Sequence, residues 1–297
     1  MPGGSRDIFV TARDGLRLHA REYGSRSTAG LPVVCLPGLT RTVADFESLA
    51  PLLATGGSRR VIAIDSRGRG LSGYDSNPAN YNVAVELGDV ASVLTALAIG
   101  PAVFVGSSRG GILTMLMGAA NPAIIAGVVL HDIGPVIESA GLARIKGYAG
   151  KLPQPRSFAD GADILQRLFG GQFPKLTTQD WLASARRTWR EDNGVMTPTY
   201  DVRIGDTLAD LDVSKPFPTL WKEFEALAGK PILVIRGSNS DILSAETVAA
   251  MAARHPGLDV VEVPDQGHVP ILEGPLNTRI ARFAADCDSA CSPRTVT

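Results

Sequence analysis

Short apolar runs alternate with longer stretches of helical periodicity over the first 134 residues. Apolar runs of strand length cover 32–36, 60–65, 102–106 and 126–132. Apolar residues recur at helical spacing around 43–55, 81–97 and 109–120. Strands that are apolar on both faces, separated by helices, are typical of a parallel sheet covered on both sides. The opening residues instead predict an antiparallel hairpin, because IFVTA and LRLHAREY flank Asp14-Gly15, a dipeptide favoured in tight turns.

The alternation stops at Gly134-Pro135 and resumes with a strand pattern at 231–237. A helix near 245–254, a strand at 258–264 and a last helix near 270–285 follow. The segment between, which includes ADILQRLF and WLASARRTW, is amphipathic with helical spacing and has no strong strand pattern.

The pattern therefore predicts an α/β fold with an eight-stranded, mostly parallel sheet and helices on both faces. Residues 1–134 and 231–286 would form this core, and 135–230 would form a helical cap inserted after the sixth strand. The polar end of the chain, 287–297, is expected to be a flexible tail.

Composition and charge give no reason to expect nucleic acid, a membrane or a metal as a partner of this protein. The chain has 297 residues, 44% of them hydrophobic, and a formal net charge of −1, which is typical of a soluble globular protein and gives no electrostatic reason to expect nucleic acid or a membrane surface as partner. The start, MPGGSRDIFV, lacks a signal-peptide pattern, and no apolar run approaches the length of a membrane span, so a cytoplasmic location is expected. Cys287 and Cys291 have no ligand cluster beside them, so no metal site is expected. A small-molecule substrate is expected, and a homodimer stays open.

The stretch GSSRGG, 106–111, lies between an apolar strand pattern and a helical pattern. Gly-x-Ser-x-Gly in this setting is the pattern of a nucleophile elbow, a sharp turn that exposes a serine hydroxyl. Ser108 is therefore the predicted nucleophile, and the alternative is a merely structural turn. The backbone N–H of Arg109 would lie at the helix N-terminus, where it could bind an oxyanion.

A serine needs a base to accept its proton, and the chain has four histidines. His19 lies in the opening hairpin, and His255 lies at a helix end. His131 follows a buried strand and is more simply a core histidine. His268, on a loop after the last strand, is the predicted base because that loop belongs at the same sheet edge as Ser108.

The acid that orients the histidine is predicted to be Asp241, which follows strand 231–237 at the same edge. Asp132, after the preceding strand, is an alternative because it could reach the same imidazole. Asp265 is more simply a turn residue. The second oxyanion donor would be the backbone N–H of Leu39, in the loop after 32–36, where Gly38 permits a close approach.

Five motifs together resemble the α/β-hydrolase family, in its cap-bearing members, over nearly the whole chain. They are LPGLTRT, DSRGRGLS, GSSRGG, GSNSD and DQGH. The order Ser108, Asp241, His268 also matches that family. The resemblance implies an acyl-enzyme mechanism that requires no metal or organic cofactor. Pro37-Gly38 replaces the His-Gly more common in the family's oxyanion loop, and Arg67 and Arg69 are expected to fix loops by hydrogen bonds.

The predicted activity is hydrolysis of an ester-type bond in a small, largely apolar substrate. A serine at position 108 argues against haloalkane dehalogenases and most epoxide hydrolases, which look similar but use aspartate there. Hydrolysis of a lactone, an amide or the carbon–carbon bond of a vinylogous diketone stays open, as does a binding protein without turnover.

The cap is expected to select the substrate. Its candidate pocket walls are aromatic: Trp181, Trp189, Phe217, Trp221 and Phe224. Trp221 is the strongest of these, because it precedes the return of the chain to the sheet. No cluster of lysines or arginines is expected in the cap, which mildly disfavours highly anionic substrates.

Overall fold

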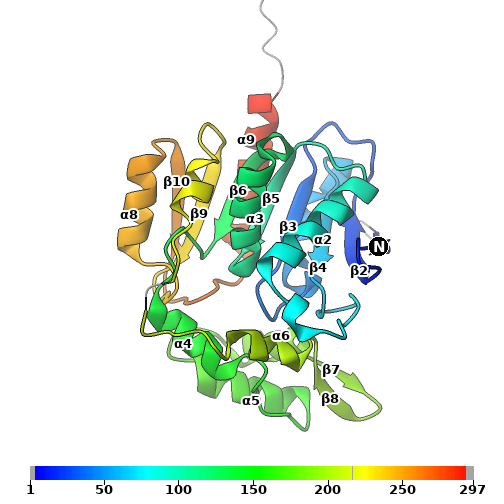
Figure 1. Cartoon of the computed structure of the whole chain (residues 1–297), viewed down its shortest axis with the longest axis vertical. Coiled ribbons are helices and arrows are strands. Elements are labelled where there is room, and N and C mark those ends of the chain that lie inside the picture. Colours follow the sequence, from blue (N-terminus) through cyan, green and yellow to red (C-terminus); the bar gives the residue numbers. More distant parts are fainter. Residues whose placement is uncertain (1–3, 216, 292–297) are drawn as a thin grey trace, which may run out of the picture.

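A computed structural model describes residues 4–215 and 217–291 and contains the predicted eight-stranded sheet (Figure 1). The strand order is β1-β2-β4-β3-β5-β6-β9-β10. Among the described pairings of this sheet, β1/β2 and β2/β4 are antiparallel and the others are parallel. The strands are β1 (Ser5–Thr11), β2 (Arg17–Tyr23), β3 (Val33–Leu36), β4 (Val61–Asp65), β5 (Ala102–Ser107), β6 (Ile125–His131), β9 (Ile232–Gly237) and β10 (Leu258–Val263).

The central strands β3, β4, β5 and β6 are buried along their whole length, which explains their continuous apolar sequences. The outer strand β10 instead alternates between exposed and partly buried residues. In the parallel register Ser107, the last residue of β5, pairs with His131, the last residue of β6. Ser108 and Asp132, which directly follow these two strands, therefore lie at the same edge of the sheet.

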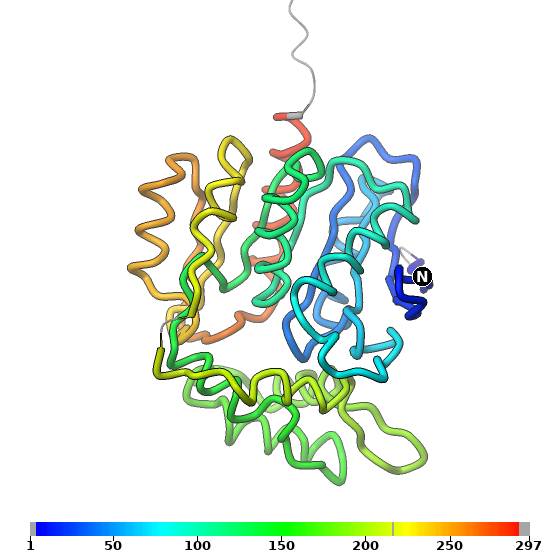
Figure 2. Tube along the Cα trace, in the orientation of Figure 1, coloured from blue at the N-terminus to red at the C-terminus, as the bar shows by residue number. Residues whose placement is uncertain are grey.

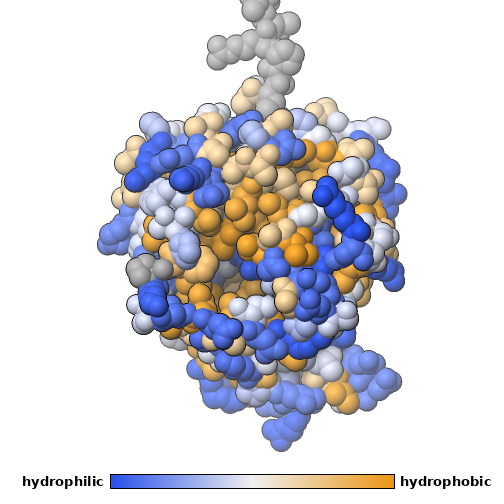
Figure 3. Space-filling view, in the orientation of Figure 1, coloured by the Kyte–Doolittle hydropathy of each residue, from blue (hydrophilic) through white to orange (hydrophobic). Residues whose placement is uncertain are grey.

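Helices cover both faces of the sheet. The helices α2 (Val83–Ala96), α3 (Arg109–Ala120) and α8 (Ala245–Arg254) pack on one face. The helices α1 (Leu49–Leu53) and α9 (Gly274–Cys291) pack on the other, and Figure 2 shows α9 behind the sheet. Figure 3 shows hydrophobic side chains gathered over the middle of the first face and mostly hydrophilic ones over the outer surface of the cap.

The expectation of a flexible tail from residue 287 is wrong for its first residues. Helix α9 continues to Cys291, and Cys287 is buried in the core between α9 and the sheet. A Cβ built on Gly127 of β6 would lie 2.5 Å from the Cys287 sulfur, so the helix and the strand approach closely there. The remaining tail residues, 292–297, lie outside the described residues.

The segment inserted between β6 and β9 forms a cap across one edge of the sheet (Figure 1). Its elements are α4 (Ser139–Tyr148), α5 (Phe158–Phe169), α6 (Thr178–Thr188), β7 (Trp189–Asp192), β8 (Val195–Pro198), a 3-10 helix (Val202–Leu208) and α7 (Trp221–Glu225). The hairpin β7/β8 corrects the expectation of an all-helical insertion. Its turn is Asn193-Gly194, both with positive φ, and this dipeptide is the usual signal of a tight hairpin turn.

Buried arginines connect the loop after β4 to its neighbours, as predicted. Arg67 makes two hydrogen bonds of 2.7 Å with Asp89 of α2 and one with Asp75. Arg69 donates to the Leu39 carbonyl at 2.8 Å and to Glu86 at 2.8 Å. These bonds fix the loop after β3, which carries Leu39, relative to the sheet.

His19 is buried on β2 between two carboxylates and gives the fold a testable pH dependence. Its ring nitrogens lie 2.7 Å from Asp65 and 2.9 Å from Asp7. Burial opposes the charged imidazole, but these hydrogen bonds outweigh it and raise the pKa of His19. A raised folded-state pKa stabilises the protein fully below the unfolded value of about 6.5, and the stabilisation is lost as pH rises through the folded pKa.

We therefore expect His19→Gln to lower the free energy of unfolding by about 1–3 kcal/mol at pH 5.5, and by less at pH 9. Urea unfolding of both proteins at the two pH values measures the difference, and the comparison cancels groups that titrate identically in both. A gap that is constant or widens with pH would contradict the assigned charge of His19.

Candidate active site

Ser108 sits at the sharp turn between β5 and α3. Its backbone has φ 50° and ψ −115°, a strained conformation for a residue with a side chain. The two glycines of the motif make the turn sterically feasible. A Cβ on Gly106 would lie 2.6 Å from the backbone of Gly110, and a Cβ on Gly110 would overlap the Leu36 carbonyl. The turn thus requires glycine at both positions, and it is the predicted elbow.

His268 connects Ser108 to a carboxylate. Its Nε2 lies 2.7 Å from the Ser108 hydroxyl, and its Nδ1 lies 2.8 Å from Asp132 Oδ2. The His268 side chain is only 5% exposed, so bulk water has little access to these bonds. The loop after β10 therefore brings the predicted histidine to the predicted serine.

The prediction that Asp241 contacts His268 is wrong, because Asp132 occupies that place. Asp132 directly follows β6 and is fully buried, with φ 55°. It accepts hydrogen bonds from the Gly237 N–H at 2.7 Å and from the Ser240 hydroxyl at 2.6 Å. These donors hold the carboxylate toward His268, and the left-handed backbone of Asp132 is the second strained non-glycine position in this site.

Asp241 instead pairs with the cap. Its two carboxylate oxygens accept from Arg144 Nε at 2.6 Å and Nη2 at 2.7 Å, so the contact is bidentate. Burial tends to raise the pKa of Asp241, but the hydrogen bonds and charge of Arg144 outweigh burial and lower it. The carboxylate that sequence assigns to the histidine thus connects the loop after β9 to helix α4.

The two predicted oxyanion donors lie beside Ser108. The Arg109 amide is the first of α3, and the Leu39 amide lies in the loop after β3. A Cβ built on Gly38 would be 3.6 Å from the Ser108 Cβ, so this loop touches the elbow. Within the described residues neither amide donates to a protein acceptor. The Arg109 guanidinium pairs with Glu86 at 2.6 Å, the same carboxylate that holds Arg69.

A second serine–histidine pair lies next to the first. The Ser107 hydroxyl is 2.5 Å from His131 Nδ1, and both side chains are buried. Burial lowers the pKa of His131 to about 4, so this imidazole is neutral at pH 7. No carboxylate of the described residues bonds it, so it lacks the orienting group that Asp132 gives His268.

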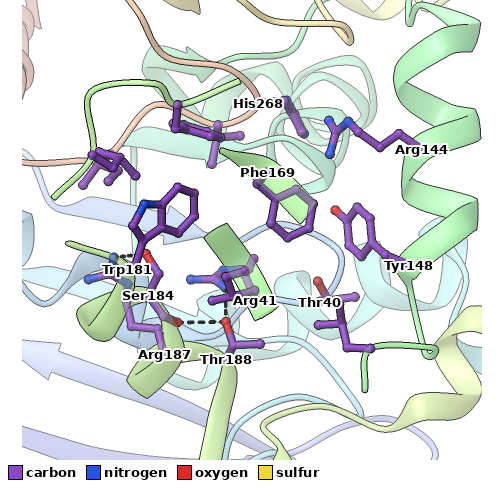
Figure 4. A pocket seen from close by; sticks show the side chains of 16 residues that line it. Thr40, Arg41, Arg144, Tyr148, Phe169, Trp181, Ser184, Arg187, Thr188 and His268 are labelled. Atoms are coloured by element: carbon purple, nitrogen blue, oxygen red, sulfur yellow. Dashed lines mark hydrogen bonds between the residues drawn. The ribbon is translucent and has the colours of Figure 1, made fainter. Parts of the chain in front are cut away.

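A cavity of about 160 Å³ lies between the cap and the sheet edge and reaches His268 (Figure 4). Its apolar lining includes Leu165 and Phe169 of α5 and Trp181 of α6, together with loop residues Leu152, Phe173, Leu176, Val269 and Ile271. Its polar lining includes Thr40, Arg41, Arg144, Tyr148, Ser184, Arg187 and Thr188. The cavity is therefore a mixed one, with apolar walls and several guanidinium groups.

Only one of the predicted aromatic walls lines this cavity. Trp181 does, whereas Trp189 is buried in the cap's own core and pairs across the hairpin with Pro198. Trp221 and Phe224 pack edge to face, with ring centroids 6.0 Å apart, on the core beneath α3 and α8. Phe217 packs against that core too. The predicted substrate contacts of Trp189, Trp221 and Phe224 are thus wrong, because these rings fill apolar space nearer to them.

Sequence reasoning missed Arg41, Arg144 and Arg187. For α6 a signal was present, because Trp181, Ser184 and Thr188 recur at spacings of three and four and so share one helix face. All three line the cavity, with Arg187 beside them. For Arg41 and Arg144, only the docking of the cap on the sheet shows that they converge.

Comparison with known proteins agrees with this fold. The model of the alpha/beta hydrolase family matches residues 33–281. An alpha/beta hydrolase from Novosphingobium aromaticivorans is 40% identical, with a TM-score of 0.85, covering 96% of this chain and 98% of that one. The 3-hydroxybutyrate-oligomer hydrolase of Cupriavidus necator is 30% identical over 95% of this chain and 98% of its own length. The sn-1-specific diacylglycerol lipase of Mus musculus is 30% identical over 81% of this chain and 76% of its own length.

The chain belongs to the alpha/beta hydrolase family, and it is a hydrolase. Within the described part of the chain, we find no helix with the length and apolar character needed to cross a membrane.

Proposed function

We propose that this protein is a serine hydrolase that cleaves a carboxylic ester through an acyl-enzyme. The observation that carries the proposal is the continuous hydrogen-bond chain from Ser108 through His268 to Asp132, with distances of 2.7 and 2.8 Å. A serine hydroxyl becomes a nucleophile when a base accepts its proton, and a buried carboxylate keeps that base in the right tautomer.

In the proposed first half-reaction, Ser108 Oγ bonds to the ester carbonyl carbon while its proton passes to His268 Nε2. The carbonyl oxygen becomes an oxyanion held by the N–H groups of Leu39 and Arg109. The carbon–oxygen bond to the alcohol then breaks, and the alcohol takes the proton from His268. In the second half-reaction, water attacks the acyl carbon and gives a proton to His268. The bond from the acyl carbon to Ser108 Oγ then breaks, His268 returns the proton to Ser108 Oγ, and the acid leaves.

Asp132 keeps the Nδ1 proton of His268 facing away from Ser108 and stabilises the imidazolium that forms in each half-reaction. The hydrogen bonds from Gly237 and Ser240 fix the orientation of the Asp132 carboxylate, which can still accept a hydrogen bond from His268. Arg69 acts indirectly: it donates to the Leu39 carbonyl and so restrains the backbone of the residue whose N–H is one of the proposed oxyanion donors.

An ester with a short acyl group fits the cavity. Its volume of about 160 Å³ is below the ~300–1,000 Å³ of most small-molecule pockets. The names of two relatives, an oligomer hydrolase and a diacylglycerol lipase, support the same bond class, because lipases hydrolyse esters.

Intact-mass measurement after incubation with a fluorophosphonate, followed by peptide mapping, tests the nucleophile. We expect one adduct, on the peptide that carries Ser108. In parallel, turnover of p-nitrophenyl butyrate should exceed that of p-nitrophenyl palmitate, an amide, a lactone and a vinylogous diketone. A folded chain without an adduct would favour a binding protein, and turnover of the diketone alone would favour carbon–carbon hydrolysis.

A further inference from the structure

Three arginines from separate elements line the cavity that reaches His268. Arg41 comes from the loop after β3, Arg144 from α4 and Arg187 from α6. The sequence-based expectation mildly disfavoured highly anionic substrates because no cluster of cap lysines or arginines was identified, and this convergence removes that reason. Arg144 is already neutralised by its bidentate bond to Asp241. Among the described residues, Arg41 and Arg187 have no such separate partner for each of their charges.

Arg41 and Arg187 share a single carboxylate, and the sharing is unequal. Arg41 donates to both carboxylate oxygens of Asp45, at 2.8 and 2.5 Å, and to the Thr188 hydroxyl at 3.0 Å. Arg187 Nε lies 3.7 Å from the same carboxylate, and its Nη2 donates to the Ser184 hydroxyl at a long 3.4 Å. Arg187 therefore has most of its donor capacity left for another acceptor.

The other carboxylates near Arg187 do not replace that acceptor. Glu47 and Glu273 line a neighbouring cavity of about 310 Å³ that Arg187 also borders. Glu47 is paired with Arg21 at 2.9 Å, and both glutamates are exposed, so solvent screens them. The Arg187 side chain, in contrast, is only 22% exposed. Burial, followed by the like charge of Arg41, lowers the pKa of Arg187, so a bound anion would relieve this unfavourable environment.

We propose that the substrate is an acidic ester, with a carboxylate that binds the Arg187 guanidinium while its ester group lies at Ser108 and His268. Figure 4 shows Arg41 and Arg187 away from His268, with Trp181 and Phe169 between them along the cavity. A short apolar spacer between the carboxylate and the ester matches these aromatic walls. The inference rests on the proposed ester hydrolysis and adds the substrate class.

Two esters of matched length test the charge preference. Mono-p-nitrophenyl glutarate carries a carboxylate at its far end, and p-nitrophenyl valerate carries a methyl group there. We expect kcat/KM to be at least about tenfold higher for the glutarate at low salt, and the preference to shrink in 0.5 M KCl. The ratio of the two kcat/KM values should fall at least about tenfold in Arg187→Met, mainly through KM, because the contact binds substrate and transition state alike.

Arg186→Met is the matched control. Arg186 is the preceding residue of α6, is exposed, and places its guanidinium 4.7 Å from the Phe158 ring centroid, outside the cavity. This variant should keep the glutarate-to-valerate ratio of the native protein. Arg187→Lys retains the charge without the planar fork and should keep part of the preference, which separates loss of charge from a folding defect.

The outcomes separate the two proposals. Without a fluorophosphonate adduct and without hydrolysis of either ester, the proposed function itself fails. With an adduct and valerate hydrolysis, but no preference for the glutarate or an unchanged ratio in Arg187→Met, ester hydrolysis stands and the acidic substrate class is overturned.

Discussion

Replacing Ser108 with alanine should lower kcat for ester hydrolysis by about 10⁴-fold or more and abolish the fluorophosphonate adduct. The hydroxyl is the only atom group removed, and the oxyanion donors of Leu39 and Arg109 remain. Any residual rate would therefore reflect substrate binding and oxyanion stabilisation alone. Rates with p-nitrophenyl butyrate and intact-mass spectra measure the two effects.

Ser107→Ala is the matched control, because Ser107 is the neighbouring serine of the same motif. It bonds the neutral, buried His131 rather than His268. This variant should keep the adduct and remain within about tenfold of the native rate, although loss of a buried hydrogen bond costs about 1–3 kcal/mol of stability. If folded Ser107→Ala loses the adduct while Ser108→Ala retains it, Ser107 is the nucleophile and the assignment of Ser108 is wrong.

The second large effect concerns the acid. Asp132→Asn should lower kcat by about 10³–10⁴-fold, because an amide at this position favours the wrong tautomer of His268 and cannot stabilise its imidazolium. The asparagine side chain is nearly isosteric, and its oxygen can still accept from Gly237. Circular dichroism and thermal unfolding should therefore show a folded protein, while steady-state kinetics show the loss.

Asp241→Asn separates the two candidate carboxylates. Asp241 bonds Arg144 and not His268, so we expect kcat to stay within about tenfold of the native value. The variant weakens a partly buried ion pair between the cap and the sheet, so its effect should be greater on stability or KM than on kcat. A large loss of kcat in Asp241→Asn, with a near-native Asp132→Asn, would reverse the assignment of the acid.

Local signals were enough for the fold and for two residues of the site. Continuous apolar runs separated by helical spacing predicted the central strands, because burial on both faces removes the polar alternation. The glycines around Ser108 predicted the elbow, because only glycine leaves room for the backbone that crosses there. His268 followed from its place just after the last strand, since the ends of parallel strands share one edge.

The same reasoning could not choose between Asp132 and Asp241, because both follow parallel strands at that edge. Tertiary structure decided which of the two contacts His268. The Gly237 amide and the Ser240 hydroxyl hold Asp132 toward His268, whereas Arg144 of the cap helix α4 binds Asp241. The positive φ of Asp132 has no sequence signal, because aspartate is common in ordinary turns.

Sequence by itself determined the layered fold, the sharp turn at Ser108 and the histidine that contacts this serine, because these depend on patterns within single strands, turns and helices. Tertiary structure alone decided which carboxylate contacts His268, which aromatic rings line the cavity and which charged groups border it. Trp221 packs against the core beside α3, whereas Arg41 and Arg187 both contact the Asp45 carboxylate. Such contacts depend on how the cap docks on the sheet, and docking brings together residues far apart in the chain.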